Sequence, residues 1–375
     1  MGSSLANIYR LGVKELWSLV RDPVMLVLIV YTFSFSIYVA ATAMPGGIHN
    51  AAIAIVDQDD SPLSARIVSS FYPPDFKTPV LISSAVADAG MDNGDYTFIL
   101  EIPADFQRDV LARRAPTLQL NVDATRMSQA FTGNTHIQQI IGREVNEFVQ
   151  RSSDATALPV GLDLRMRFNP NLEQAWFGSL MEIINNVTML SIILTGAALI
   201  REREHGTIEH LLVMPVTPNE IMLAKVWSMG LVVALAALSA LIFVVQGALH
   251  VPIQGSISLF MLTVCLHLFA TTSMGIFLAT LARSMPQFGM LLVLVLLPLQ
   301  LLSGGTTPRE SMPQLVQDIM LAAPTTHFVA AAQAILYRGA GLDMVWPQLL
   351  AILSIGSLLF MASLMRFRKT ISQMA

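Results

Sequence analysis

Charged residues and cysteine are both scarce in this chain. Only 13% of the 375 residues are charged, about half of the roughly 25% found in an ordinary soluble domain. The single cysteine, Cys265, excludes an internal disulfide and a zinc site built from paired cysteines. Lysine is rare as well, and none of the four lysines follows a glycine. That excludes the phosphate-binding loop of an ATPase from this chain.

Nucleic acid is not an expected partner, because 22 basic residues against 26 acidic ones leave a net charge of −4. What the chain has in abundance is apolar sequence, with 54% hydrophobic residues and a mean hydropathy of +0.59. A single water-facing core cannot hold that much apolar sequence, so we expect a membrane protein. The first apolar run, from Pro23 to Ala43, is too long for the core of a cleaved signal peptide and indicates a retained anchor.

Six apolar segments are long enough, or nearly so, to cross a hydrocarbon layer, which takes about 20 residues. They are Pro23 to Ala43, Trp176 to Ile200, Val226 to Leu249, Ile257 to Leu281, Phe288 to Ser303 and Trp346 to Met365. The fifth is short unless it extends back to Ser284, and Pro298 within it is expected to kink the helix.

Basic residues predict the orientation, because lysine and arginine beside short loops stay on the cytoplasmic side. Ten of them fall on one side of the predicted spans: Arg10, Lys14, Arg21, Arg201, Arg203, Lys225, Arg283, Arg366, Arg368 and Lys369. The opposite short connections carry only Arg309 and Arg338. With six spans, both termini are therefore predicted to be cytoplasmic.

The predicted fold class is an α-helical integral membrane protein with six transmembrane helices and an inserted α/β extracytoplasmic domain between the first and second. Residues 1–43 form a cytoplasmic segment and the first span, residues 44–175 form the inserted domain, and residues 176–375 hold the other five spans. In the inserted domain we predict strands at 51–56, 96–102, 118–122 and 162–168, with helices at 61–70, 104–113 and 126–151. The segment before the first span is either a helix lying in the membrane interface or a plain extension of that span.

The connection from 201 to 220 carries helix start and stop signals. Gly206 suits the end of the second span, Thr207 can cap a short helix that Pro215 ends, and Thr217 with Glu220 forms a capping box for the next helix. His205, Glu209 and His210 also suggest zinc. The two histidines, however, are five residues apart rather than one helical turn, which favours a surface contact.

The sequence from Arg201 to Pro215 resembles the coupling helix of type-2 permeases of ABC transporters, whose pattern is close to R-E-R-E-x-G-T-x-E-x-L-L-x-x-P. Met214 departs from the Ser or Thr common in that family. Further similarity lies at residues 168–170, 302–305, 308–313, 324–328 and 334–339. The chain is most similar to bacterial inner-membrane export permeases of the drug-efflux type.

This resemblance implies that the chain has no cofactor of its own and is driven by separate ABC ATPase subunits that bind ATP and Mg. It further implies a second permease copy or close homologue, a possible periplasmic adaptor and a place in the bacterial inner membrane. The residues that it assigns to ATPase coupling are Arg201, Glu202, Arg203, Glu204, Gly206, Thr207, Glu209 and Pro215.

Polar or helix-breaking residues inside the spans are candidates for a substrate path. They are Glu182, Asn185, Asn186, His267 and Pro298. The alternatives stay open: His267 can simply hydrogen-bond another helix, and Glu182 lies close enough to the end of its span to be solvated. The connection from Ser303 to Asp343 is expected to form short helices that enter the outer leaflet, with a surface loop as the alternative.

Three functions remain as hypotheses. The first is ATP-driven export of an amphipathic, drug-like or lipid-like substrate, and the second is export of a polysaccharide or lipid-linked polymer, which the large outward domain disfavours. The third is a membrane-anchored sensor, although the cytoplasmic segments are too short for an output domain. An intramembrane enzyme has no catalytic dyad in the spans to support it.

The predicted topology can be tested with reporter fusions. A fusion after Gly47 or after Gly339 should report an extracytoplasmic position, and one after Thr217 a cytoplasmic position, because the basic residues resist translocation. The reverse pattern would overturn the orientation.

Overall fold

The computed structural model describes residues 2–42, 50–114, 116–123, 127–152, 174–204, 216–307 and 309–372. The chain divides into two compact units, each treated by itself below. One joins Met1–Met44 to Ala175–Ala375 and is helical; the other, Pro45–Gln174, is mixed α/β.

The helical unit begins with α1 (Gly2–Val20), which ends before α2 (Pro23–Val30) starts. Asp22 caps α2 by accepting a hydrogen bond from the backbone N–H of Met25 at 3.2 Å. The segment before the first span is thus a helix of its own and not a continuation of that span. It packs on α10, where Trp227 stacks on Tyr9.

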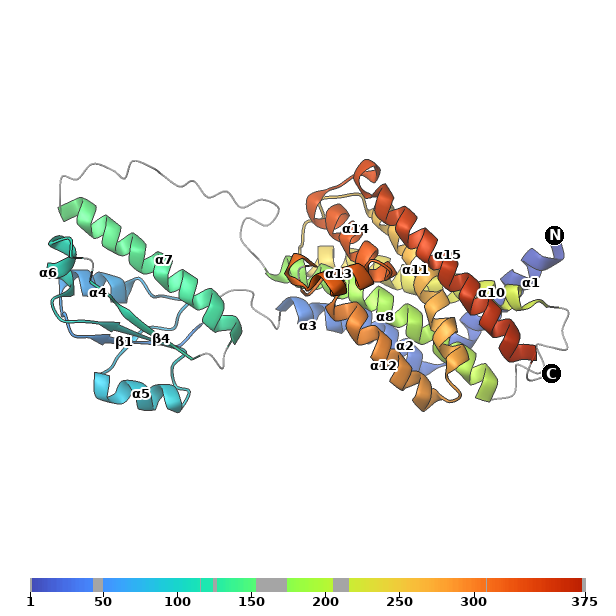
Figure 1. Ribbon diagram of the computed structural model, residues 1–375, viewed down its shortest axis with the longest axis horizontal. Helices are drawn as coiled ribbons and strands as arrows, with labels where there is room; N and C mark the ends of the chain where they lie inside the picture. The colour runs from blue at the N-terminus through green and yellow to red at the C-terminus, as the bar shows by residue number, and fades with distance from the viewer. Residues whose placement is uncertain are drawn as a thin grey trace. The chain divides into compact units, whose positions relative to one another are not determined.

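Apolar helices make up the rest of this unit. The first span continues from α2 through a π-helical turn, η1 (Tyr31–Phe35), into α3 (Ser36–Thr42). There follow α8 (Gln174–Glu204), α10 (Pro218–Ser239) with its π-helical continuation η2 (Ala240–Ala248), α11 (Ile257–Leu281), α12 (Met285–Leu301) and α15 (Leu342–Ser372). Helix α1 begins and α15 ends at the same end of the bundle (Figure 1).

Five helices in the described part of the chain are long and apolar enough to cross a membrane, and they contain five of the six predicted spans. The predicted span 288–303 is the shorter helix α12, with 17 residues, and it starts at Met285 directly after Ser284. At 1.5 Å per residue it is about 25 Å long, less than the roughly 30 Å hydrocarbon layer. Pro298 lies in its last turns.

The connection after α12 is helical rather than a plain loop. It contains η3 (Arg309–Ser311), α13 (Gln314–Met320) and α14 (Pro324–Arg338). The axes of α13 and α14 meet at 90°, and together the two helices are apolar enough to form a broken span or a re-entrant loop. A left-handed Gly339 ends α14.

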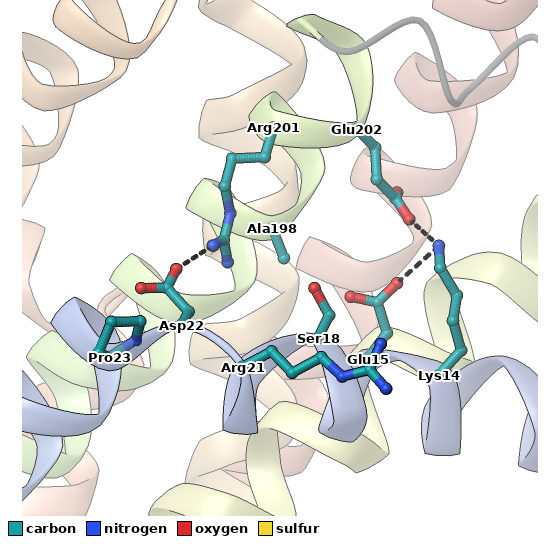
Figure 2. Close-up of a pocket in the computed structure, with 9 residues that line it drawn as sticks. All are labelled: Lys14, Glu15, Ser18, Arg21, Asp22, Pro23, Ala198, Arg201 and Glu202. Atoms are coloured by element: carbon teal, nitrogen blue, oxygen red, sulfur yellow. Dashed lines mark hydrogen bonds and ion pairs between the residues drawn. The ribbon is translucent and has the colours of Figure 1, made fainter.

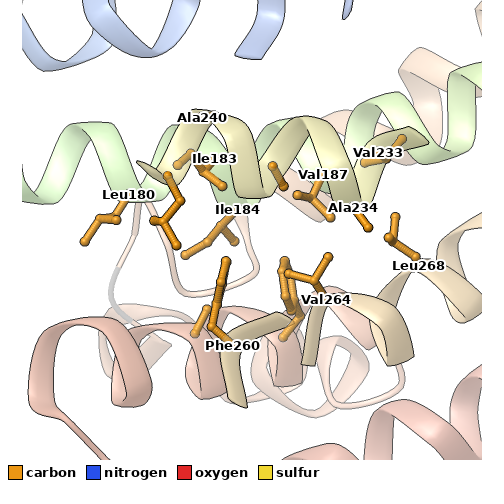
Figure 3. Packing of buried hydrophobic residues seen from close by; sticks show 14 of the residues in the cluster. Leu180, Ile183, Ile184, Val187, Val233, Ala234, Ala240, Phe260, Val264 and Leu268 are labelled. Carbon is orange, nitrogen blue, oxygen red and sulfur yellow. The ribbon is translucent and has the colours of Figure 1, made fainter. Parts of the chain in front are cut away.

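Helix α8 lies at the centre of the bundle. Within its most apolar stretch 83% of residues are buried, against 28% for the first span and for α15. Its side chains pack against α10, η2 and α11 (Figure 3), and the core residues labelled there are Leu180, Ile183, Ile184, Val187, Val233, Ala234, Ala240, Phe260, Val264 and Leu268. A displacement of α8 would therefore disturb side-chain packing in most of the unit.

The α/β unit holds a four-stranded sheet in the order β2-β1-β3-β4. Its strands are β1 (Ile53–Asp57), β2 (Val80–Leu81), β3 (Phe98–Ile102) and β4 (Gln119–Val122); β1 is parallel to β2 and β3, whereas β4 is antiparallel to β3. Because side chains alternate along a strand, each face has its own cover. Helices α4 (Pro62–Ser69), α6 (Phe106–Leu111) and α7 (Met127–Ser152) cover one face, and α5 (Ser84–Asp92) covers the other.

Six of the predicted elements of this unit match β1, α4, β3, α6, β4 and α7 within a few residues. The pattern missed β2, which is only two residues long, and α5. The strand predicted at 162–168 lies outside the described residues.

Two helical glycines in the bundle give a matched test of its packing. A Cβ at Gly275 in α11 would lie 2.7 Å from the backbone oxygen of Ile192 in α8, whereas a Cβ at Gly289 in α12 meets nothing within 4 Å. Backbone cannot move aside as a side chain can, so Gly275→Ala should lower the midpoint of thermal unfolding in detergent by several degrees. Gly289→Ala should leave it unchanged or raise it, since alanine is the better helix former by about 1 kcal/mol. Equal midpoints for the two variants would contradict the close α8–α11 contact.

Candidate functional site

The charged sequence Arg201-Glu202-Arg203-Glu204 forms the last turn of α8, which we call the 201–204 turn. Successive residues of an α-helix point about 100° apart, so four consecutive side chains spread around the whole helix. Each of them reaches a different part of the helical unit.

Arg201 forms an ion pair with Asp22, the residue that caps α2 (Figure 2). Asp22 therefore has two roles, since one carboxylate oxygen holds the helix start and the other holds Arg201. This pair ties the end of α8 to the beginning of the first span.

Glu202 belongs to a buried network of ion pairs with α1 and α10. Nζ of Lys225 in α10 lies 2.9 Å from Oε1 of Glu15 and 2.7 Å from Oε2 of Glu202. Nζ of Lys14 donates to Oε1 of Glu202 at 2.7 Å and lies 3.6 Å from Glu15. The Lys225 side chain is only 2% exposed and that of Lys14 is 49% exposed.

Two carboxylates that share one buried ammonium group do not have equal environments. Burial raises the pKa of the Glu15 carboxyl, and the neighbouring charge of Glu202 acts in the same direction, while Lys225 opposes both. Removing Lys225 would leave Glu15 buried with little compensation. The network therefore fastens three helices, α1, α8 and α10, only while all its members are present.

The other two residues of the turn hold the junction between α11 and α12. The Arg203 guanidinium donates to the backbone oxygens of Ala282 at 2.5 Å and Ala279 at 3.1 Å, at the end of α11. The backbone N–H of Met285, the first residue of α12, donates to Oε1 of Glu204 at 3.0 Å. A cation at a helix C-terminus and an anion at a helix N-terminus are both favourable placements.

A cavity of about 570 Å³ lies beside these contacts, between α1 and the end of α8 (Figure 2). It is lined by Lys14, Glu15, Ser18, Arg21, Asp22, Pro23, Ala198, Arg201 and Glu202. Three members of the network, Lys14, Glu15 and Glu202, thus line this cavity, whereas Lys225 does not.

Segment 205–215 lies outside the described residues, and with it Gly206, Thr207, Glu209 and Pro215. The capping box predicted just beyond is confirmed. Thr217 accepts from the Glu220 backbone N–H at 3.3 Å, Glu220 accepts from that of Thr217 at 2.7 Å, and Pro218 opens α10. The segment is therefore bounded by a fixed helix end at Glu204 and a fixed helix start at Pro218.

The substrate-path candidates in α8 are partly engaged with the first span. Asn186 is 2% exposed and donates to the backbone oxygen of Thr32 at 2.8 Å, within the π-helical turn η1. Glu182 accepts from the hydroxyl of Ser36 at 2.6 Å, and Asn185 is half-buried.

His267 hydrogen-bonds another helix, which is one of the two roles that the sequence left open for it. Its Nε2 lies 2.8 Å from the hydroxyl of Thr188 in α8, and its ring stacks on Phe328 of α14 with centroids 4.0 Å apart. It is fully buried, and its Nδ1 atom has no hydrogen-bond partner among the described residues. A role of these residues in a substrate path stays a prediction.

The sequence reasoning missed Glu15, Asp22 and Lys225. Two signals were available in the sequence. Lys225 lies in the first turns of an apolar helix, and Glu15 lies on the otherwise apolar side of α1. For a metal, the part of the chain that the structure describes contains no group of three His, Cys, Asp or Glu side chains able to hold one.

A bundle with five described helices long and apolar enough to cross a membrane indicates a multi-pass membrane protein. The chain belongs to the ABC-2 family transporter proteins, since that family's model matches residues 21–365.

Relatives support the assignment over the full length. The chain is 64% identical over 371 residues to the inner membrane transport permease YhhJ of Escherichia coli (strain K12), with 99% of each chain covered. It is 28% identical over 364 residues to the probable multidrug ABC transporter permease YbhR of the same organism, covering 96% of this chain and 97% of that one. It is 24% identical over 358 residues to the probable multidrug ABC transporter permease YbhS, covering 90% of each.

Lys225 and Lys14 provide a matched pair for testing the network. Lys225→Met should lower the free energy of unfolding by about 3 kcal/mol or more, because it strands a buried carboxylate. Lys14→Met removes a half-exposed partner of the same Glu202 and should cost about 1 kcal/mol or less. Denaturation in mixed micelles measures both, and equal losses would contradict the network. The loss for Lys225→Met should shrink as the pH falls, because Glu15 then takes up a proton and needs no counter-ion.

Proposed function

We propose that the chain is the membrane subunit of an ATP-driven exporter and that a separate ATPase subunit moves it by pressing on the 201–220 connection. ATP and Mg bind to the partner chain, since this chain lacks the glycine-lysine pair of a phosphate-binding loop. The proposal goes beyond the family assignment in naming the direction of transport, the energy source and the point of contact.

The observation that carries the proposal is the attachment of the 201–204 turn. Its four side chains reach α2, the α1–α10 network, the end of α11 and the start of α12. A push on segment 205–215 acts directly on Glu204 and on the capped start of α10. Because those ends are held by charged contacts, the push would displace several helices together instead of bending a loose loop.

The burial of Glu202 divides the roles of the coupling residues. Its side chain is 10% exposed and already pairs with Lys14 and Lys225, so within this proposal it transmits motion and does not meet the ATPase. Arg201 and Arg203 act in the same way, and Glu204 holds α12. The surface that meets the ATPase then consists of Gly206, Thr207, Glu209 and Pro215.

The orientation in the proposal places the 201–204 turn and both termini in the cytoplasm and the α/β unit outside. Ten basic residues at the ends of the predicted spans support this placement. In this proposal a second permease copy or close homologue completes the transport path, and a periplasmic adaptor binds to the α/β unit.

The proposed substrate is amphipathic, either drug-like or lipid-like. Two of the relatives carry the word multidrug in their names, and the spans are strongly apolar, with mean hydropathy between 1.7 and 2.6 in the five long helices. No observation in the described chain favours a polymer substrate over this one.

A cross-linking experiment tests the contact with the ATPase. Cys265, the chain's only cysteine, is first replaced by serine; Thr207→Cys or Thr306→Cys is then introduced, the second as a control between α12 and α13. A reagent with a maleimide at one end and a photoreactive group at the other, used in native membranes, should join Thr207→Cys to a protein whose peptides include a glycine-lysine phosphate-binding loop. Thr306→Cys should give no such product. Cross-linking at Thr306 alone would contradict both the contact and the orientation.

A further inference from the structure

A second cavity in the helical unit, of about 460 Å³, lies far from the 201–204 turn. It is formed by the start of α8, the segment that follows α12, and α14, so it is near the opposite ends of α8 and α12. Its lining residues are Phe177, Ser303, Gly304, Gly305, Thr306, Arg309, Thr326, Val329, Ala330, Gln333 and Arg338.

The charge of this cavity has one sign. Two arginines, Arg309 and Arg338, line it, and none of its described lining residues is acidic. At the other end of the unit, by contrast, Arg201 pairs with Asp22 and Arg203 donates to backbone oxygens. Two guanidinium groups beside one cavity attract an anion, and a guanidinium fits phosphate or carboxylate oxygens in a bidentate manner.

Two buried polar atoms at the cavity have no hydrogen-bond partner in the described chain. They are Nε of Arg309 and the hydroxyl oxygen of Thr326, whose residue is 3% exposed. Leaving a buried donor unpaired is unfavourable, so native proteins rarely do so without a ligand or water. Both atoms can donate, and both belong to residues that line the cavity.

The cavity runs along one side of α14. Thr326, Val329, Ala330 and Gln333 line it, and residues three or four apart share one face of a helix. Gly304, with a φ of +94°, lets the segment after α12 turn sharply beside Arg309.

We propose that this cavity binds a tetrahedral oxyanion through its two arginines, Arg309 and Arg338. The apolar side chains Phe177, Val329 and Ala330 line the same space and suit the remainder of an amphipathic molecule. The oxyanion has two possible sources, the phosphate of an anionic lipid or a free phosphate ion. The inference does not rest on coupling to an ATPase, so it can fail or succeed independently of the proposed function.

Binding is measured on the purified full-length chain in a neutral maltoside detergent, without any ATPase. One arm titrates inorganic phosphate by calorimetry; the other adds phosphatidylglycerol or phosphatidylcholine and counts retained lipids by native mass spectrometry. The variants are Arg309→Gln and Arg338→Gln. The matched control is Arg283→Gln, which removes the same charge from an exposed arginine between α11 and α12.

Each cavity variant should weaken binding of the oxyanion, with Arg309→Gln weakening it about tenfold or more, and Arg283→Gln should leave it unchanged. Binding of inorganic phosphate that depends on Arg309 identifies a site for the free anion. Retention of phosphatidylglycerol but not phosphatidylcholine, with no phosphate binding and the same dependence, identifies a lipid headgroup site.

The inference is overturned if neither probe binds, or if binding is equal in the control and in all cavity variants. Arg338 is exposed at the end of α14, so Arg338→Gln keeps the test decisive should a buried variant fail to fold.

Discussion

The helical unit depends on one arrangement above all, the burial of Lys225 between two carboxylates from other helices. A lone ammonium group inside a protein is strongly disfavoured, so Lys225 is tolerable only while Glu15 and Glu202 stay within ion-pair distance. Such a network adds little net stability compared with an apolar core, but it fixes which helices meet and in which register. Here it fixes α1 and α10 to the end of α8.

That constraint gives the 201–204 turn its mechanical character. Helix α8 is buried along most of its length, and at its end the four charged residues extend to α2, α1 with α10, α11 and α12. The last turn of α8 is therefore fixed to several of the helices around it. At the other end of the unit, the cavity near Arg309 is lined by two arginines and, among the described residues, by no acidic side chain.

Much of the fold follows from local sequence. The six apolar segments all lie in helices, and Thr217, Pro218 and Glu220 form the predicted capping box because capping requires only neighbouring residues. The strands at 53–57 and 98–102 follow from their apolar runs. In contrast, β2 has two residues and makes no periodic pattern, so only its pairing with β1 defines it.

The candidate site was less predictable, because its contacts join residues far apart in the chain. Glu15 and Lys225 are separated by 210 positions, and Lys14 and Glu202 by 188. Hydrophobic periodicity indicates on which face of a helix a charged residue lies, but it does not indicate which distant residue pairs with it. The family resemblance predicts that Glu202 contacts the ATPase, and nothing in the local sequence indicates its ion pairs with Lys14 and Lys225.

The central claim is that force applied to segment 205–215 reaches the helices held by the 201–204 turn. Hydrogen exchange on the permease–ATPase complex, with and without a non-hydrolysable ATP analogue, measures this directly. The account predicts that nucleotide changes the exchange of backbone amides in the last turn of α8, the first turns of α10 and α12, and the part of α1 around Glu15 together. A change confined to 205–215, with the flanking helices unaffected, would contradict it.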